Sequence, residues 1–317
     1  MKYIVTILLL LIHLVLNAQE SSFTQYFQSP LLFNPASAGS SNSTWRFNNI
    51  FRQQFFGPNA SFNTIATSFD SSPVSIRGFG VGALFVSDKT LGGNIKSTTA
   101  SANLSYSVYF DEGRYNKLSI GFAGIYGNKR IDFSKLTFAN QYLSSGGFDQ
   151  NLSSGEANLN ASSTYLTSGA GLIYNNTKKN FAWELGAAVY NLNRPKLSIL
   201  NDSLNYVPNR YIVHSKCLLL TNASGVIDLN AMYQSLQNVN YYTIGAIYTN
   251  NYLFLEGNKS ISGGVLYNSN KIVTPYLGIK FTTLKLSFTY DIFMSGTKIN
   301  LVNSKTFEFS INFLPNN

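Results

Sequence analysis

The chain has 317 residues, of which 44% are hydrophobic and only 12% are charged. Ordinary soluble domains carry about 25% charged residues, so roughly half of the expected charge is missing. The net charge is +9, and the chain contains 24 Phe, 20 Tyr and 24 Gly. This composition is too apolar and aromatic for a disordered chain, and the average hydropathy excludes a bundle of membrane helices. What remains is a folded chain with the composition of a β-protein.

The N-terminal residues 1–18 predict a secretory signal peptide. Lys2 precedes an apolar run from Ile4 to Leu16, and Ala18 supplies the small residue before a cleavage site. The run is shorter than the roughly 20 apolar residues that a transmembrane anchor requires. We therefore expect cleavage after Ala18 and export of the mature chain from the cytoplasm.

Few residues could support catalysis or bind a metal. Beyond the leader, His214 is the only histidine and Cys217 the only cysteine, whereas a zinc site normally takes about three or four such ligands. A single cysteine also excludes a disulfide within the chain. Because no nucleophile motif or close carboxylate pair accompanies His214, we expect no enzyme, metal or cofactor. The basic residues are dispersed, which disfavours nucleic acid as a partner.

Beyond residue 40, apolar and polar residues alternate in segments of about ten residues, as in β-strands with two different faces. The last segment is the clearest: Phe307, Phe309, Ile311 and Phe313 alternate with polar residues at 308, 310 and 312. The pattern predicts about 14 strands, a number that is even in single-chain bacterial barrels. The predicted strands are Thr44–Phe55, Ala60–Phe69, Ile76–Ser87, Asn94–Phe110, Asn116–Ile131, Ser163–Tyr174, Phe181–Leu192, Arg210–Leu220, Val226–Ser235, Tyr241–Thr249, Ile261–Asn268, Ile272–Phe281, Leu284–Phe293 and Ser304–Phe313.

A soluble sandwich would also alternate, but three features favour a transmembrane outer-membrane β-barrel of antiparallel strands. The strands are long and even, aromatic residues recur near their ends, and short and long connections alternate. Asp111–Asn116 and Asn175–Asn180 are short, whereas Asp132–Ser162 and Asn193–Asn209 are long. The segment Asn250–Ser260 could hide a further strand. We expect an all-β fold with one barrel domain over residues 44–317.

Residues 19–43 are a poor strand and are predicted to form an ordered plug or a periplasmic lead-in. Pro35 cannot donate a ladder hydrogen bond, and Gly39 permits a turn with positive φ. The glycines Gly78, Gly80 and Gly82 lie within a strand pattern and precede no helix, so they predict close packing rather than a phosphate-binding loop. Phe309 is expected to face lipid and Ser310 the interior, where a lysine should be tolerated.

Three short motifs follow the leader: Gln25-Tyr26, then Asn34-Pro35-Ala36-Ser37-Ala38-Gly39, then Arg52-Gln53-Gln54-Phe55. With these motifs the chain resembles the PorP/SprF family of outer-membrane proteins of the Bacteroidetes type IX secretion system. The family characteristically has a Gln-Tyr element, an Asn-Pro-Ala-x-Ala-Gly turn and an Arg-Gln-Gln-aromatic strand, and the likeness runs from leader to C-terminus. Two departures are a phenylalanine where the family commonly has tryptophan, and Phe307 before Glu308 where it often has a His-Glu pair. The motif residues, which are also possible partner contacts, are Gln25, Tyr26, Asn34, Pro35, Ala36, Gly39, Arg52, Gln53, Gln54, Phe55, Tyr290 and Asp291.

The resemblance implies an outer-membrane component that binds a secreted partner and supports its export or surface attachment. Such a partner would carry a type IX C-terminal domain, as gliding adhesins do, and other secretion-system subunits and outer-membrane lipid would be further partners. The long loops Asp132–Ser162 and Asn193–Asn209 are the first candidates for binding, and Asn34–Ser40 is the second. The residues alone leave a passive channel for small solutes open as the alternative, with an enzyme a distant third.

Overall fold

The computed structural model describes residues 23–41, 43–55, 61–73, 77–90, 94–133, 138–143, 146–149, 151–153, 162–197, 205–221, 225–237, 239–251, 259–294 and 305–315. The predicted signal peptide lies outside these residues. So does residue range 252–258, which makes up most of the segment that could hide a further strand.

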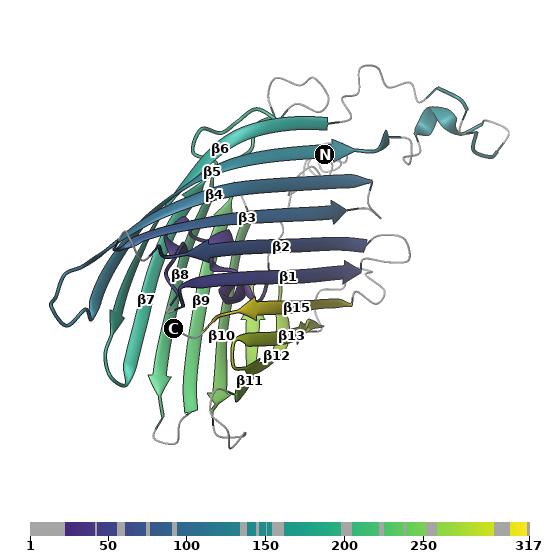
Figure 1. Cartoon of the computed structure of the whole chain (residues 1–317). Coiled ribbons are helices and arrows are strands. Elements are labelled where there is room, and N and C mark those ends of the chain that lie inside the picture. The colour runs from purple at the N-terminus through teal and green to yellow at the C-terminus, as the bar shows by residue number, and fades with distance from the viewer. Residues whose placement is uncertain are drawn as a thin grey trace, which may run out of the picture.

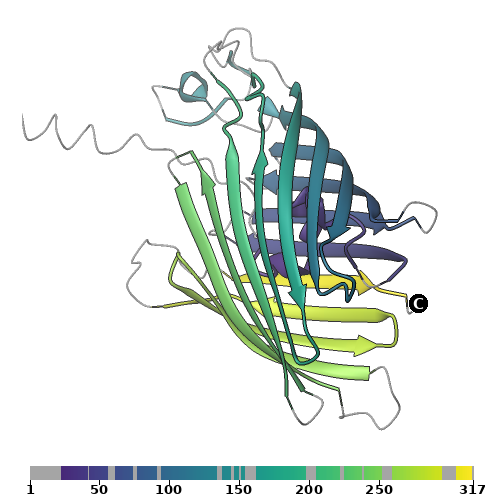
Figure 2. The same ribbon diagram turned by 90° about the vertical axis from the view of Figure 1, so that its left-hand side faces the viewer.

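The strands form one closed antiparallel barrel (Figures 1 and 2). Each strand pairs with its neighbours in the chain, and the pairing of β1 with β15 joins the first strand to the last. The strands are β1 (Trp45–Phe55), β2 (Ser61–Ser71), β3 (Phe79–Thr90), β4 (Ile95–Tyr109), β5 (Asn116–Ile131), β6 (Ser162–Thr177), β7 (Phe181–Tyr190), β8 (Arg210–Leu220), β9 (Gly225–Leu236), β10 (Val239–Asn250), β11 (Lys259–Asn268), β12 (Ile272–Phe281), β13 (Leu284–Tyr290), β14 (Ile292–Phe293) and β15 (Thr306–Phe313).

The 15 labelled strands make a 14-strand barrel, because β13 and β14 are two parts of one strand. Tyr276 pairs with Thr289 and Val273 with Ile292, which is a single continuous register along β12. The positions that do not pair with β12 are Tyr290 and Asp291, which the register places opposite Pro275 and Thr274, and the nitrogen of Pro275 carries no hydrogen for the ladder. The predicted barrel of about 14 strands is therefore confirmed, and the predicted strand 284–293 is corrected to two pieces.

The two faces of the wall differ as the alternation predicts. On β15, Phe309 is 37% exposed on the outer surface, whereas Glu308 and Ser310 have no exposed surface and point into the lumen. The same contrast holds on β4, where Leu104 is exposed and Asn103 is buried. The outer face can meet lipid tails, and the lumen collects the polar side chains. No helix among the described residues is long and apolar enough to cross a membrane.

The two rims of the barrel carry connections of different length. The short connections at residues 110–115 and 178–180 lie at the rim where β1 begins and β15 ends, which we call the turn rim. The long connections at residues 132–161 and 191–209 lie at the opposite rim, the loop rim. Outer-membrane barrels carry short turns on the periplasmic side and longer loops outside. Exposed aromatic side chains follow both rims: Trp45, Phe69, Tyr106, Phe181 and Phe313 near the turn rim, and Tyr126, Tyr211, Tyr233, Tyr242 and Tyr290 near the loop rim.

The apolar core lies inside the barrel and not between two layers. It is formed by the N-terminal segment 23–41, which we call the plug, and by lumen-facing wall residues (Figure 1). From the plug, Phe23 and Phe33 meet Ile50 of β1, Ile212 of β8 and other buried wall residues. The interior of the barrel is therefore packed by the chain's own N-terminal segment.

Candidate functional site

The plug is built from three single-turn 3-10 helices, η1 (Tyr26–Gln28), η2 (Pro30–Leu32) and η3 (Pro35–Ser37). Pro30 and Pro35 begin η2 and η3, where the fixed φ of proline suits the first helical position. These prolines also prevent the segment from adding a strand to the wall. The plug consequently lies across the lumen and satisfies its polar groups against the wall strands.

The first residues of the plug bind a buried carboxylate. Glu308 of β15 accepts hydrogen bonds from the backbone nitrogens of Thr24 and Gln25, at 2.7 and 2.9 Å. The same carboxylate pairs with the guanidinium of Arg52 from β1, the strand beside it. Glu308 thus joins the plug to the wall through three donors, although no histidine precedes it.

Arg52 bridges two wall carboxylates and the plug. Its Nη2 atom lies 3.0 Å from Asp291, which also accepts a 2.7 Å hydrogen bond from Thr274. Its Nη1 atom donates to the Thr24 hydroxyl at 3.0 Å. Removing one member of such a buried set leaves an uncompensated charge, which typically costs about 3–5 kcal/mol. We call Thr24, Gln25, Arg52, Asp291 and Glu308 the charged dock.

The Gln25 side chain completes the charged dock with its amide. Its nitrogen donates to the Thr289 hydroxyl at 3.0 Å, and its oxygen accepts from Ser287 at 2.8 Å and from Ser310 at 3.3 Å. All these wall hydroxyls belong to β13 and β15 and face the lumen. A fully buried amide in such a polar socket fixes one position of the plug along these strands.

Tyr26 packs its ring into the apolar core of the plug. The ring lies edge-on to Phe27 and Phe33, with centroids 5.6 and 5.7 Å away. Its hydroxyl is buried without a hydrogen-bond partner among the described residues. Burial raises the pKa of this phenol, with the Asp228 and Glu184 charges adding to the shift, so Tyr26 stays neutral. Its contribution is apolar packing.

The Asn34–Ala36 turn sits directly on glycines of the wall. The Asn34 amide oxygen accepts from Ala36 nitrogen at 3.0 Å, and its nitrogen donates to the carbonyl oxygen of Leu172 at 3.1 Å. A Cβ atom at Gly171 would collide with the Asn34 side chain, and one at Gly121 with the Pro35–Ala36 backbone. We call Asn34, Pro35 and Ala36 with Gly121 and Gly171 the glycine seat.

A second ion pair, between Arg46 of β1 and Asp70 of β2, binds the C-terminal end of the plug. Gly39, with φ of +61°, donates from its nitrogen to Asp70 at 2.9 Å. Asp70 also accepts two hydrogen bonds from Arg46, which itself donates to Ser37 oxygen at 3.1 Å. The positive φ and the close approach of Ser71 oxygen, 2.8 Å from an added Cβ, require glycine here. The exit angle toward β1 is fixed by this cluster.

The glycines of the 78–82 stretch have the close packing that the sequence predicts. A Cβ at Gly80 would overlap the carbonyl of Ala38, and one at Gly82 would lie 2.9 Å from Leu31. Ser105 of β4 donates to the Ala38 oxygen at 2.7 Å. Gly80 and Gly82 are thus explained by the near approach of the plug, whereas Gly78, with φ of +81°, lies against Ser107 of β4.

His214 is a lumen residue beside the glycine seat. Its Nε2 atom lies 3.1 Å from the Asn34 amide nitrogen, and its Nδ1 atom lies 3.6 Å from Glu184. It therefore accepts a hydrogen bond from Asn34 through Nε2 and carries its proton on Nδ1 toward Glu184. A position that the sequence marks as an ordinary strand residue thus helps to bind the plug.

Not every motif residue belongs to these sites. Gln53 and Tyr290 lie on the outward-facing rows of β1 and β13, and the Phe55 side chain lies outside the described residues. Gln54 faces the lumen, and its amide oxygen can accept from Arg52 at 2.8 Å. The motif residues Gln25, Tyr26, Asn34–Ala36 and Gly39 thus belong to the plug, Arg52 binds it, and Asp291 supports Arg52. Gln53 and Tyr290 remain on the outer surface.

The motif reading missed several wall residues that bind the plug. Glu308, Arg46 and Asp70 are buried in the lumen, although the chain carries few charges. A charge within the lumen-facing row of a predicted strand is the one sequence signal that could have identified them. Alternation assigns such a charge to the lumen but cannot identify the group that it meets there.

Comparison with known families identifies the family of this chain. Residues 15–313 match the family described as "Type IX secretion system membrane protein PorP/SprF". The chain belongs to the PorP/SprF family. The PorP/SprF fold and family place it in the outer membrane as a component of the type IX secretion system, and they are those of a secretion-system barrel rather than of an enzyme. No curated protein matches the chain.

Solved barrels resemble this PorP/SprF chain in fold. A mutant of the monoaromatic hydrocarbon channel TodX superposes with a TM-score of 0.51 at 8% identity, covering 90% of this chain and 92% of that one. The P. putida toluene transporter TodX gives 0.50 at 6% identity, covering 94% and 95%. A Pseudomonas aeruginosa FadL homologue gives 0.48 at 10% identity, covering 88% and 92%. At these identities, the likeness shows the barrel fold alone.

Proposed function

We propose that the protein binds a secreted partner with a type IX C-terminal domain, such as a gliding adhesin, and supports its export or surface attachment. The protein would reach the outer membrane after cleavage of a signal peptide at residues 1–18. It would work there with other subunits of the secretion system. The family match over residues 15–313 supports the system, and the plugged lumen supports a binding role.

The observation that carries a binding role is the distribution of plug contacts around the lumen. Among the described residues, hydrogen bonds join the plug to nine wall strands: β1, β2, β4, β6, β7, β8, β12, β13 and β15. Phe27 adds apolar packing against Tyr276, Ile247 and Leu266 of β12, β10 and β11. A lumen packed in this way disfavours passage of a polypeptide or a solute and favours use of the barrel as a scaffold.

Partner binding is assigned to the loop rim. The connections at residues 132–161 and 191–209 are the longest, and binding is commonly carried by loops on rigid scaffolds. The motif residues Gln25, Asn34 and Ala36 are buried in the lumen. Contact of these residues with a partner would require the plug to leave, so we place them second to the loops.

The test compares surface proteomes of a deletion strain and its parent. We expect the deletion to abolish surface display of one large secreted protein with a type IX C-terminal domain, while other secreted proteins remain displayed. Complementation with the intact gene should restore display. Complementation with a chain whose 138–153 loop segment is replaced by a short Gly-Ser linker should insert a barrel without restoring display. Unchanged display of every secreted protein in the deletion strain would contradict the proposal.

A passive channel is the second candidate, because the chain shares its barrel fold with the hydrocarbon channel TodX. Planar-bilayer conductance of the purified protein separates the two functions. The scaffold proposal expects a closed barrel, whereas a steady open conductance of the wild-type protein would favour the channel. A variant that lacks residues 23–41 serves as the open control, because removal of the plug empties the lumen.

A further inference from the structure

Three cations form one row on the outer surface at the loop rim. Lys89 of β3 is directly paired with Lys96 of β4, and Lys96 is directly paired with Arg130 of β5. All three residues are exposed and stand in the outward-facing rows of their strands. Since neighbouring strands lie about 4.8 Å apart, the row places three positive charges within about 10 Å.

The row forms no ion pair within the described residues, although Asp132 follows Arg130 by two positions. None of the ion pairs found in the described part of the chain includes Lys89, Lys96 or Arg130. Asp88, the adjacent carboxylate, turns to the lumen side and accepts a 2.6 Å hydrogen bond from Thr64. Like charges directly opposite one another destabilise a sheet. An anion bound outside the barrel would remove that repulsion.

From the cation row toward the middle of the barrel wall, each successive row of outward-facing side chains has a different chemical character. The next outward row is Ser87, Thr98 and Asn128, and the row after it is Phe85, Ala100 and Tyr126. Below them lie the smallest side chains, with Ala83, Ala102 and Gly124 side by side and exposed. An added Cβ on Gly124 would meet nothing within 4 Å. Phe85 and Tyr126 therefore flank a shallow strip, while Leu104 and Phe122 border it on the other side.

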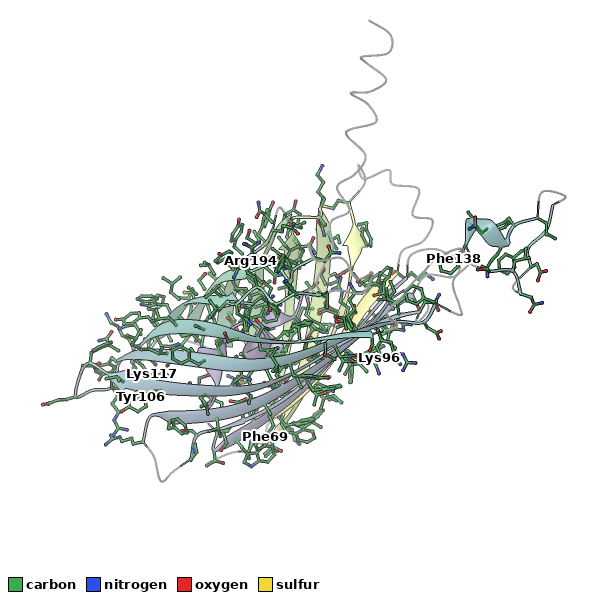
Figure 3. All side chains as sticks on the ribbon, turned by 90° about the horizontal axis from the view of Figure 1, so that it is seen from above. Phe69, Lys96, Tyr106, Lys117, Phe138 and Arg194 are labelled. Carbon is green, nitrogen blue, oxygen red and sulfur yellow. The ribbon has the colours of Figure 1, made fainter. Side chains whose placement is uncertain are left out.

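The matching outward row at the opposite ends of these strands contains no cation, although Arg77, Arg114 and Lys117 lie near that rim. Phe79, Tyr106 and Ile120 form the matching outward row near the turn rim. Figure 3 places Lys96 and Tyr106 at opposite ends of the barrel wall. The cation row is thus confined to the rim that carries the long loops, which faces the outer leaflet in barrels of this class.

We propose that this surface binds a lipid of the outer leaflet whose headgroup exposes a phosphate with net negative charge. Lys89, Lys96 and Arg130 hold the phosphate, and the strip at Ala83, Ala102 and Gly124 receives an acyl chain. The order of charge, hydroxyl, aromatic and small residues matches the order of groups in such a lipid from headgroup to tail. The site uses only the outer wall, so it is independent of the partner proposed for the loops.

The test measures lipid binding to the purified full-length protein in detergent by native mass spectrometry. The probes are phosphatidic acid and phosphatidylcholine with the same acyl chains, with inorganic phosphate as a soluble competitor. We expect phosphatidic acid to bind at least about tenfold more tightly than phosphatidylcholine. The triple variant Lys89→Gln, Lys96→Gln and Arg130→Gln should weaken phosphatidic acid binding about 100-fold and leave phosphatidylcholine unchanged.

The matched control removes the same charge from the same rim elsewhere: Arg194→Gln, Lys196→Gln and Lys271→Gln. This control should retain phosphatidic acid binding, and an equal loss in both triple variants would overturn the site. If millimolar inorganic phosphate displaced phosphatidic acid completely, the site would bind free phosphate, and the lipid proposal would be overturned. Ala102→Trp, which fills the strip, should lower phosphatidic acid affinity in a folded barrel. Unchanged affinity would overturn the role of the strip.

Discussion

Two parts of the plug are bound to the same barrel wall by different physical means. At the charged dock, Glu308 and Arg52 bind the first plug residues through directional, charge-assisted hydrogen bonds. At the glycine seat, in the middle of the plug, Pro35 and Ala36 lie so close to β5 that only glycine fits at position 121. The first part depends on charge and the second on shape.

The difference shows how a short segment without regular hydrogen-bonded structure can be held in one position. Charged groups in the lumen are buried, so each is stable only while its partners remain in place. A glycine seat contains no charge, and it is disrupted by added volume. Charge-neutralising and volume-adding substitutions should therefore affect the charged dock and the glycine seat separately.

The largest effect is expected for Arg52→Met. It leaves Glu308 and Asp291 buried without their cation, which should destabilise the barrel by about 3–5 kcal/mol. The measurement is the temperature at which the purified barrel loses its heat-modifiable migration on SDS gels. Adding Glu308→Gln to this variant should recover part of the loss, because one orphan carboxylate is removed. Lys179→Met, in the exposed turn at residues 178–180, is the control and should leave the transition temperature unchanged.

Phe309→Lys should be next, and it separates the wall from the plug. A lysine facing the middle of the bilayer costs about 2–4 kcal/mol, so insertion into lipid vesicles should fall while folding in detergent is spared. Ser310→Lys should act differently. Ser310 is fully buried beneath Gln25, so the sequence-based expectation of tolerance is corrected: the lysine displaces the plug. Protease cleavage within residues 23–41 reports that displacement, and identical behaviour of the two variants would argue against a two-faced wall.

Gly121→Val tests the glycine seat. The new side chain would overlap the Pro35–Ala36 backbone, and overpacking of this kind costs about 1–3 kcal/mol. We expect a lower transition temperature and a protease-sensitive plug, with the barrel still assembled. The matched control is Gly124→Val on the same strand, where the added Cβ points to open space. Equal loss in both variants would trace the effect to strand propensity instead of the plug.

The smallest effect is expected for Tyr26→Phe. The Tyr26 hydroxyl is buried and finds no hydrogen-bond partner among the described residues, so its removal leaves no donor or acceptor behind. The ring contacts with Phe27 and Phe33 persist. We expect a change within about 1 kcal/mol, toward neutral or slightly higher stability, in the same thermal assay. A loss of several kcal/mol would indicate a water-mediated network around the hydroxyl.

Alternation made the barrel predictable because a wall residue has only two environments, lipid and lumen. The predicted ranges 116–131, 210–220 and 272–281 coincide with β5, β8 and β12. Most other boundaries moved by one to three residues, as strand ends do when turn geometry decides the last pair. The break between β13 and β14 required the register, since only pairing shows that Pro275 stands opposite Tyr290.

The sequence by itself determined the class of the protein, through missing charge, period-two alternation and the motif around Asn34 and Arg52. Its family was recognisable because such motifs are local strings of residues. Only the tertiary structure decided what those residues contact, because Thr24 meets Glu308 from 284 positions away along the chain. Alternation specifies which face a side chain occupies but not which distant residue shares the lumen with it. The docking of the plug and the outer row of cations both depend on strand register, which is set when the barrel closes.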